Sequence, residues 1–404
     1  MLIVKKFGGS SVADAAKVKN VANRIIEDYN KGHQIVVVLS AQGDTTDILL
    51  EKAEEVSSNP SKRELDMLLS TGEQQSVALM AMAIKAAGYP AISLNAFQTG
   101  ISTTRVYGNA RIKNIDVERL KNELERRSIV LVTGFQGVNR YEDYTTLGRG
   151  GSDTTAVALA AALNADVCEI YTDVDGVYTA DPRMVPEATK IEEITYDEML
   201  ELASLGARVL HNRSVELAKK FKVNMVVRSS LNNHSGTYVK EEAKVERMLI
   251  SGVASDTNVC RLSVSNIKDE PGKAYEIFSL LARNNINVDI ILQSIGREDK
   301  KDISFTVAKK DKEEVIRLLK EHQQTIGFDK IDAEDNVAKV SVVGAGMAAN
   351  AGVASRMFEA LYDAGVNINM ISTSEIKISV LVNAEDEAKA VQSIHSAFFS
   401  KSNI

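Results

Sequence analysis

The chain has 404 residues, more than one hydrophobic core normally organises, so two or three domains are expected. Apolar residues make up 44% and charged residues 25%, and the 24 Gly against 5 Pro argue against a disordered or collagen-like chain. The net charge of −7 is spread along the sequence without a Lys/Arg block, which disfavours a nucleic-acid or anionic-membrane surface. Small-molecule partners are therefore expected, with no nucleic acid and no membrane among them.

The cysteines and apolar runs predict a cytoplasmic protein. Cys168 and Cys260 lie far apart, and Cys168 falls in an apolar run typical of a buried strand, which indicates free thiols in a reducing compartment. Neither residues 1–6 nor the longest apolar runs approach the length of a signal sequence or a membrane span. The five histidines form no metal-ligand spacing with a cysteine or another histidine, so no metal site built from protein side chains is expected.

Short β-branched runs alternate with helical patterns through the first 170 residues, which predicts a mostly parallel α/β sheet. The predicted strands are residues 3–4, 35–39, 91–94, 129–133 and 167–171. The first helix, with apolar residues at helical spacing from Val18 to Tyr29, has Ser10 or Ser11 as its predicted N-cap and Gly32 as its stop.

A loose polar stretch at residues 229–247 predicts a domain boundary, and the chain repeats itself beyond it. Gly272 and Gly352 lie 80 residues apart, and Asn287 and Asn367 match at the same spacing. Each copy predicts a strand, a Gly-containing loop, an amphipathic helix and two further strands, at residues 286–292 and 303–307 in the first copy and at 366–371 and 376–382 in the second. The predicted domains are residues 1–245, 250–335 and 336–404.

The segment Lys6-Phe7-Gly8-Gly9-Ser10 lies between the first strand and the first helix and has the composition of a phosphate cradle. Two glycines let backbone N–H groups approach a polyanion, a helix N-terminus favours negative charge, and the lysine adds a positive charge. The alternative is a tight turn that needs glycine for its dihedral angles. No Walker A sequence occurs in the chain.

Three further loops and one glutamate are candidates for ligand binding. Residues 40–47 follow a predicted strand, where open α/β sheets bind ligands, although an ordinary turn has a similar composition. Residues 147–155 combine Arg149 with a helix N-terminus and suit a carboxylate; the alternative is N-capping by Ser152 or Asp153 with Arg149 solvated. Residues 171–183 suit a nucleotide. Glu73, predicted near a helix start, either binds a ligand or compensates the helix dipole.

Together these segments closely resemble the aspartate kinases of the amino acid kinase family over essentially the whole chain, and the repeated tail resembles their paired ACT modules. The resemblance implies an amino acid kinase-type α/β sandwich around a mostly parallel sheet, followed by two ferredoxin-like βαββαβ ACT modules. It also implies transfer of the γ-phosphoryl group of ATP, with Mg²⁺, to the β-carboxylate of L-aspartate. Feedback regulation by lysine, threonine or both is implied, as is a homodimer or larger homo-oligomer formed through the ACT modules.

The family pattern also implies roles for individual residues. Lys6 would stabilise the transferring phosphoryl group, and Asp153 would hold this lysine in place. Substrate-binding residues would be Ser40, Thr46, Glu73, Arg149, Gly150, Gly151 and Ser152, with Arg149 on the α-carboxylate and Glu73 on the α-ammonium group. The nucleotide would contact Lys6, Phe7, Gly8, Gly9, Ser10, Thr172, Asp173, Tyr178, Thr179, Asp181, Arg183 and Arg208.

The amino-acid effector would contact residues of both repeats, namely Asp269, Gly272, Ala274, Asn287, Val288, Asp289, Gln293, Val353, Ala354, Asn367, Ile368, Ser374 and Glu375. Asn287 and Asn367 have a second interpretation as turn residues. The chain departs from the family at Arg208 and Asn212, where Lys and Pro are usual, and at Asn350-Ala351, where His-Pro is usual. Lysine inhibition, alone or with threonine, is the working hypothesis.

Three alternatives compete with these interpretations. Residues 340–349 mimic a dinucleotide-binding fingerprint, but they fall inside the repeat and are better interpreted as a loop of the second module. A catalytically inactive amino-acid sensor would be expected to lose some of the residues Lys6, Glu73, Arg149 and Asp153, and all four are present. A sibling kinase that acts on another carboxylate stays open.

Overall fold

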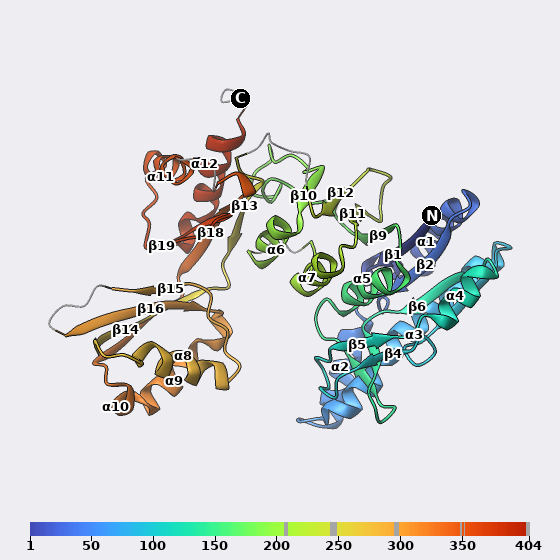
Figure 1. Cartoon of the computed structure of the whole chain (residues 1–404), viewed down its shortest axis with the longest axis horizontal. Coiled ribbons are helices and arrows are strands. Elements are labelled where there is room, and N and C mark those ends of the chain that lie inside the picture. The colour runs from blue at the N-terminus through green and yellow to red at the C-terminus, as the bar shows by residue number, and fades with distance from the viewer. Residues whose placement is uncertain (206–208, 243–248, 295–298, 348–349, 351, 401–404) are drawn as a thin grey trace. The chain divides into compact units, whose positions relative to one another are not determined.

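The computed structural model describes residues 1–205, 209–242, 249–294, 299–347, 350 and 352–400. The chain divides into two compact units, the first made of residues 1–178 and 189–246 and the second of residues 179–188 and 247–404 (Figure 1). A ten-residue excursion after Tyr178 therefore belongs to the second unit, although the chain on both sides of it belongs to the first.

A mostly parallel sheet is the centre of the first unit, as the sequence predicts. In the described residues it has the strand order β10 (Glu193–Thr195), β12 (Thr237–Lys240), β11 (Met225–Ser229), β9 (Val167–Thr172), β1 (Leu2–Phe7), β2 (Gln34–Leu39), β6 (Ile129–Thr133) and β3 (Ala91–Leu94). Neighbouring strands are parallel except β11 with β12. The boundary predicted at residues 229–247 is wrong in part, because Thr237 and Val239 of β12 are buried in this sheet.

Helices cover both faces of the sheet. The face that carries Ile3 and Phe7 packs against α1 (Ala15–Asn30) and α3 (Lys62–Ala86), whose buried residues recur at helical spacing. On the opposite face α5 (Gly151–Leu163) packs across β1, β2 and β9. The other helices of this unit are η1 (Gly9–Val12), α2 (Thr45–Val56), α4 (Glu118–Glu125), α6 (Tyr196–Ser204) and α7 (Asn212–Phe221). A smaller sheet joins β5 (Ile112–Ile115), β4 (Ile101–Thr103), β7 (Gln136–Val138) and β8 (Tyr144–Thr146).

The first helix begins later than the sequence predicts. Its N-cap is Asp14, whose carboxylate accepts a hydrogen bond from the backbone N–H of Lys17 at 2.9 Å. Ser10 and Ser11 belong instead to the short 3-10 helix η1, which turns the chain between β1 and α1. The predicted stop is confirmed, because α1 ends at Asn30 and Gly32 takes a positive φ of 88°.

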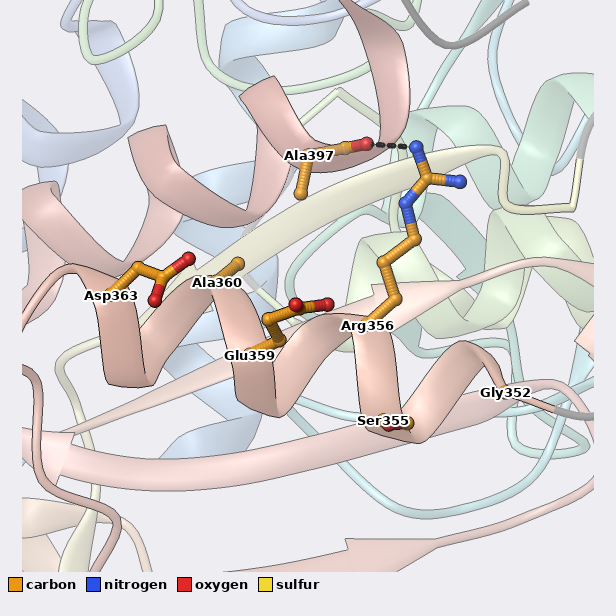
Figure 2. A pocket seen from close by; sticks show the side chains of 7 residues that line it. All are labelled: Gly352, Ser355, Arg356, Glu359, Ala360, Asp363 and Ala397. Carbon is orange, nitrogen blue, oxygen red and sulfur yellow. Dashed lines mark hydrogen bonds between the residues drawn. The ribbon is translucent and has the colours of Figure 1, made fainter.

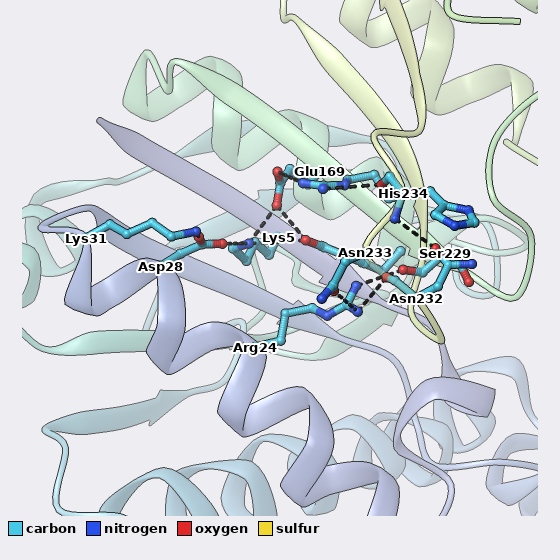
Figure 3. Close-up of polar contacts among 11 residues, drawn as sticks. Lys5, Arg24, Asp28, Lys31, Glu169, Ser229, Asn232, Asn233 and His234 are labelled. Carbon is cyan, nitrogen blue, oxygen red and sulfur yellow. Dashed lines mark hydrogen bonds and ion pairs between the residues drawn. The ribbon is translucent and has the colours of Figure 1, made fainter.

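A buried lysine fixes α1 to the sheet (Figure 3). Lys5 is completely buried and contacts Asp28 of α1 at 2.5 Å and Glu169 of β9 at 2.7 Å. Glu169 also pairs with Arg228 of β11 at 2.9 Å. Burial alone would lower the pKa of Lys5, but the charge of Glu169 raises it above its ordinary value. The ammonium group therefore stays charged and links three elements of the first unit.

The second unit contains the two predicted ferredoxin-like modules. The first module runs β14 (Cys260–Lys268), α8 (Lys273–Arg283), β15 (Ile291–Gln293), β16 (Lys300–Val307), η2 (Lys309–Asp311), α9 (Lys312–Glu321), α10 (Gln323–Ile326) and β17 (Lys330–Glu334). Its strand order β15, β16, β14, β17 is antiparallel throughout, and Figure 1 shows α8 and α9 together on one face of the sheet.

The second module takes one strand from an earlier part of the chain. It runs β18 (Val337–Val343), η3 (Ala345–Met347), α11 (Val353–Asp363), β19 (Met370–Thr373), β20 (Lys377–Asn383), η4 (Ala384–Asp386) and α12 (Glu387–Phe399). Its fourth strand is β13 (Gly252–Asp256), which pairs with β18, although these residues were predicted to belong to the first module. The strand order β13, β18, β20, β19 therefore reproduces that of the first module with β13 in the place of β17.

The 80-residue repeat is confirmed in the backbone. Gly272 and Gly352 are the N-caps of α8 and α11, with φ of 99° and 98°. The strands predicted from residues 286 and 366 are shorter than expected, because β15 begins at Ile291 and β19 at Met370. The two cysteines are free, and Cys168 is buried, as predicted; Cys260 is also buried. Among the helices that the structure describes, none has the length and apolarity needed to cross a bilayer.

Candidate active site

Predicted site residues lie at the carboxyl ends of three parallel strands, with Lys6 in β1, Ser40 directly after β2 and Thr172 at the end of β9. Lys6 of β1 lies with its Nζ 2.6 Å from Oδ1 of Asp153, and both side chains are 13% exposed. Because side chains alternate along a strand, Lys6 points to the face opposite that of Lys5, where α5 supplies Asp153 in its first turn. The predicted pairing of the catalytic lysine with Asp153 is therefore present in the structure.

The glycine loop after β1 lies directly against the loop after β2. The N–H of Gly43 donates to the carbonyl of Gly9 at 3.1 Å, and the N–H of Ser40 donates to the carbonyl of Phe7 at 3.2 Å. A Cβ on Gly9 would lie 2.5 Å from the carbonyl oxygen of Ala41. Gly9 does not have a positive φ, and Gly8 has an extended backbone. Close approach, rather than a special dihedral angle, therefore requires glycine at position 9.

Glu73 lies in the middle of α3, which overturns the prediction that it is near a helix start. Compensation of the helix dipole therefore does not explain this residue. Its Oε1 accepts a hydrogen bond from the N–H of Ala41 at 3.2 Å, which brings the glutamate to the loop that carries Ser40 and Thr46. Glu73 is 3% exposed, and burial raises its pKa to about 7 despite that hydrogen bond.

The loop before α5 holds Arg149 between glycines that need unusual backbone angles. Gly148 and Gly150 have φ of 77° and 68°, and a Cβ on Gly150 would lie 2.3 Å from atoms of His211. Gly150 is the N-cap of α5, so the proposed N-capping by Ser152 or Asp153 is wrong. Ser152 is buried against Gly134, while Arg149 is exposed and has no ion pair among the described residues.

Two residues that hold this loop were not found by the sequence analysis. Arg213 of α7 donates to the carbonyls of Leu147 and Ala110, both at 2.6 Å. Asp66 of α3 is buried and accepts hydrogen bonds from the N–H and the hydroxyl of Thr146 at 2.9 and 2.7 Å. Neither residue belongs to a recognisable motif, so only their contacts identify them.

The predicted nucleotide residues divide between the two units. Thr172 and Asp173 stand at the carboxyl end of β9, where the threonine hydroxyl donates to the aspartate at 2.9 Å. Tyr178 forms an isolated β-bridge with Lys190 and is the last residue of the first unit before the excursion. Arg208, the remaining predicted nucleotide residue of this part of the chain, lies outside the described residues.

Thr179, Asp181 and Arg183 belong to the second unit. Thr179 is buried, its hydroxyl lies 2.9 Å from Nε2 of His395 on α12, and its carbonyl accepts a hydrogen bond from the N–H of Val253 at 2.7 Å. Asp181 pairs with Arg183 at 2.6 Å. These contacts argue against a nucleotide contact by the Thr179 side chain, because the core of the second module already surrounds it.

The predicted effector residues differ in exposure. Val353 is 5% exposed, and Ala274, Val288, Ala354 and Ile368 pack against the module cores, so their side chains have little surface to offer a ligand. Asn287, Gln293, Asn367, Ser374 and Glu375 are exposed. Asp269 pairs with Lys301 at 2.8 Å, and Asp289 pairs with Lys339 of the other module. A Cβ added at Gly272 would meet no atom within 4 Å.

The second module also carries an open pocket between α11 and α12 (Figure 2). It is lined by Gly352, Ser355, Arg356, Glu359, Ala360, Asp363 and Ala397. Figure 2 shows Arg356 reaching from α11 to the carbonyl of Ala397 on α12. None of the predicted effector residues lines this pocket, so it does not support the predicted effector site.

The glycine loop beside Lys6 has the features of a site for the phosphates of a nucleotide. Gly8 lies beside the Lys6 ammonium group, since a Cβ at this position would lie 3.7 Å from its Nζ. Within the described ranges no group of three His, Cys, Asp or Glu side chains is arranged to hold a metal ion. A divalent cation at this site would therefore take most of its ligands from phosphate oxygens.

Comparison with known proteins agrees with this geometry. Residues 1–229 match the amino acid kinase family, and residues 262–323 and 340–398 match the ACT domain. Aspartokinase 2 of Bacillus subtilis (strain 168) is 50% identical over 398 residues, which cover 98% of this chain and 97% of that protein. The chain therefore belongs to the amino acid kinase family and is a kinase with ACT domains.

Solved structures show which members of the amino acid kinase family this chain resembles. E. coli aspartokinase III in complex with aspartate and ADP (R-state) superposes with a TM-score of 0.81 at 27% identity, covering 99% of this chain and 100% of that one. The same enzyme in complex with lysine and aspartate (T-state) gives a TM-score of 0.77 at 28% identity with the same coverage. Within the amino acid kinase family, this chain belongs to the aspartokinases.

Proposed function

We propose that this protein transfers the γ-phosphoryl group of ATP to the β-carboxylate of L-aspartate, giving 4-phospho-L-aspartate and ADP. The observation that carries the proposal is the Lys6–Asp153 pair at 2.6 Å beside the glycine loop, with Glu73 joined to the neighbouring loop through Ala41. E. coli aspartokinase III, which is similar over the whole chain, has been solved with aspartate and ADP and supports the same ligands here.

The reaction needs cations and positioning rather than a base. An aspartate β-carboxylate is already ionised at neutral pH, so one of its oxygens attacks the γ-phosphorus directly. The new O–P bond forms as the bond from the γ-phosphorus to the bridging oxygen breaks, and that oxygen leaves with ADP. Two anions must come together, so Lys6 lowers the barrier by stabilising the transferring phosphoryl group, and Asp153 keeps the lysine in place.

The substrate would be held by groups of opposite charge at its two ends. Arg149, which is exposed, would bind the α-carboxylate through its forked guanidinium group. Glu73 would bind the α-ammonium group, and Ser40, Thr46 and Ser152 would line the space between them. Mg²⁺ bound to the phosphates would supply further neutralisation of charge in the transition state.

The presence of Lys6, Glu73, Arg149 and Asp153 together supports an active kinase rather than an inactive sensor. A direct experiment distinguishes an aspartate kinase from a related kinase that acts on another carboxylate. ADP release is measured with ATP and one of three acceptors, namely aspartate, glutamate or acetylglutamate. Release that depends on aspartate alone is expected. A higher kcat/KM for either of the other two acceptors would overturn the assignment of the substrate.

The ACT modules would make the enzyme sensitive to lysine, alone or with threonine. E. coli aspartokinase III has been solved with lysine and aspartate, which supports lysine as the first effector to test. Activity measured against increasing lysine and threonine is expected to fall with at least one of them. We further propose a homodimer or larger homo-oligomer formed through the ACT modules, and the cytoplasmic location stays a prediction from the sequence.

A further inference from the structure

Three buried side-chain atoms near the carboxyl end of β6 have no hydrogen-bond partner among the described residues. They are Oε2 of Glu73, Oγ1 of Thr133 and Oε1 of Gln136. Glu73 is 3% exposed, and Thr133 and Gln136 are completely buried. A buried polar atom without a partner costs about 1–3 kcal/mol, and native proteins keep few of them. Orphaned atoms gathered in one place therefore indicate a group that the protein chain does not supply.

The geometry of β6 and α3 brings Thr133 to Glu73. Ile129 and Leu131 of β6 lie in one core cluster with Val77 of α3, and Thr133 continues the same face at the next alternate position. α3 leads into β3, which is parallel to β6, so the helix runs antiparallel to β6. Glu73 is one helical turn before Val77 and therefore lies nearer the carboxyl end of β6, which is where Thr133 is located.

Gln136 approaches the same point from β7. Its Nε2 donates to the carbonyl of Ser70, which is one turn before Glu73 on α3. The Gln136 amide also lies beside the Glu73 carboxyl group, where its hydrogen bond opposes the rise in the pKa of Glu73 that burial causes. Because the amide nitrogen has two N–H groups and donates both to Ser70 and to the Glu73 carboxyl group, the atom of Gln136 that is left for a ligand is the acceptor Oε1.

We propose that Gln136 and Thr133 complete, with Glu73, a three-acceptor site for the α-ammonium group of the substrate, so that Gln136 determines specificity for an amino acid. This inference rests on the proposed function, because it deepens the assignment of Glu73. An ammonium group has three N–H donors and no acceptor, which matches three orphaned oxygens of which one is a carboxylate. Ser70 fixes the orientation in which Gln136 presents its oxygen.

The proposed site explains how a small dicarboxylate without an amino group is rejected. Such a ligand would leave the three acceptors buried and unpaired, and sites built to bind a donor reject analogues that lack it by about 10⁴–10⁵-fold. The atoms are closed to solvent in the structure, so entry of the ammonium group requires a movement of the neighbouring loop that carries Ala41, whose N–H bonds to Glu73. A buried water is the other occupant, and it would make Gln136 and Thr133 purely structural.

The test compares aspartate with succinate, which has the same two carboxylates and no ammonium group. The KM for aspartate and the inhibition constant of succinate are measured for the wild type, Gln136→Leu and Thr133→Val. Gln136→Leu is expected to raise the KM for aspartate about 10-fold or more and to leave the succinate constant within about twofold, in line with the loss of one bond to a charged group. Thr133→Val, which keeps the side-chain shape, is also expected to raise the ratio of the KM for aspartate to the inhibition constant of succinate.

Gln74→Leu is the matched control, because Gln74 also donates to the carbonyl of Ser70, at 3.3 Å, but is not buried with the orphaned atoms. In Gln74→Leu the ratio of the KM for aspartate to the inhibition constant of succinate is expected to equal that of the wild type. An equal change in the aspartate and succinate constants in Gln136→Leu and in Thr133→Val would overturn the inference and leave the proposed function intact. A wild type with no aspartate-dependent ADP release would overturn both.

Discussion

The Nζ of Lys6 lies 2.6 Å from Oδ1 of Asp153, on the face of the sheet opposite the fully neutralised Lys5. The two lysines are neighbours in sequence and differ completely in surroundings. Lys5 is buried between Asp28 and Glu169, whereas Lys6 has one counterion in the part of the chain that the structure describes and is partly exposed beside the glycine loop. Lys6 is therefore the lysine placed to meet a phosphate, and Lys5 is the one that holds the fold.

Lys6→Ala is expected to lower kcat by about 10²-fold or more, because it removes the positive charge that faces the transferring phosphoryl group. The measurement is steady-state ADP release at saturating ATP and aspartate. Lys19→Ala, which removes an exposed lysine of α1, is the control and should retain wild-type kcat. A Lys6→Ala enzyme with kcat within a few-fold of the wild type would refute the catalytic role.

Lys5→Met is expected to reduce the free energy of unfolding by about 3–5 kcal/mol, because it leaves Asp28 and Glu169 without their buried counterion. Urea unfolding measures the change. Lys31→Met removes an exposed lysine that contacts the same Asp28 and should cost less than about 1 kcal/mol. Similar losses in the two variants would contradict the account of the buried cluster.

The loss in Lys5→Met should also depend on pH. Burial alone would raise the pKa of Glu169, but the charges of Lys5 and Arg228 lower it below its ordinary value. A carboxyl group with a lowered pKa in the folded state stabilises the protein above its ordinary pKa of about 4.3, and this stabilisation is lost as the pH falls through the lower folded value. The difference between wild type and Lys5→Met is therefore expected to shrink below about pH 4.3.

The KM for aspartate is expected to rise as the pH falls below about 7, because burial raises the pKa of Glu73 to about 7 and a protonated Glu73 no longer attracts an ammonium group. The side chain and the amino group of free aspartate do not titrate in this range. The profile of kcat/KM between about pH 5.5 and 8.5 measures the inflection. Glu73→Gln should remove it, and a Glu73→Gln profile identical to that of the wild type would exclude Glu73 as the titrating group.

Glu73→Gln is also expected to stabilise the protein in the absence of substrate. The carboxyl group is buried with one oxygen unpaired, and its raised pKa means that folding favours the protonated form. The loss of folding stability that the buried Glu73 carboxyl group causes is small below the ordinary carboxyl pKa and grows as the pH rises toward 7. Urea unfolding at pH 8 should show a gain of about 1–3 kcal/mol that disappears near pH 4. Equal stability of the two proteins at pH 8 would contradict this.

Arg149→Lys is expected to raise the KM for aspartate about 10-fold while kcat stays within about twofold, because one ammonium group cannot replace a forked guanidinium pair. Arg149 is exposed, so the fold should tolerate the change, and a melting curve checks this. An unchanged KM would remove Arg149 from the substrate site. A fall in kcat with unchanged KM would assign it to the transition state instead.

The strands, the repeat and the catalytic pair could be predicted because each leaves a local pattern. Hydrophobic periodicity located β1, β2, β3, β6 and β9, and the 80-residue spacing located α8 and α11. Lys6 and Asp153 were found through their motifs. Glu73 was placed at a helix start, because its polar neighbours conceal the continuity of a helix that runs from Lys62 to Ala86.

The remaining features depend on long-range packing that no short pattern encodes. β13 joins β18 rather than the module that follows it, and Thr179 enters the core of the second module although its neighbour Tyr178 belongs to the first unit. Arg213, Asp66 and Gln136 are single polar residues outside any motif. Arg213 and Asp66 are identified by the hydrogen bonds that they form in the fold, and Gln136 by a buried oxygen without a partner among the described residues.

The most direct test of the account is the identity and amount of the product. Wild type and Lys6→Ala are incubated with ATP and L-aspartate, ADP is quantified, and the acyl phosphate is trapped with hydroxylamine as its hydroxamate. The wild type is expected to form ADP and aspartyl hydroxamate in equal amounts, with none formed from glutamate or succinate, while Lys6→Ala forms about 10²-fold less of both. ADP without hydroxamate, or equal product from the two proteins, would contradict a carboxylate kinase that works through Lys6.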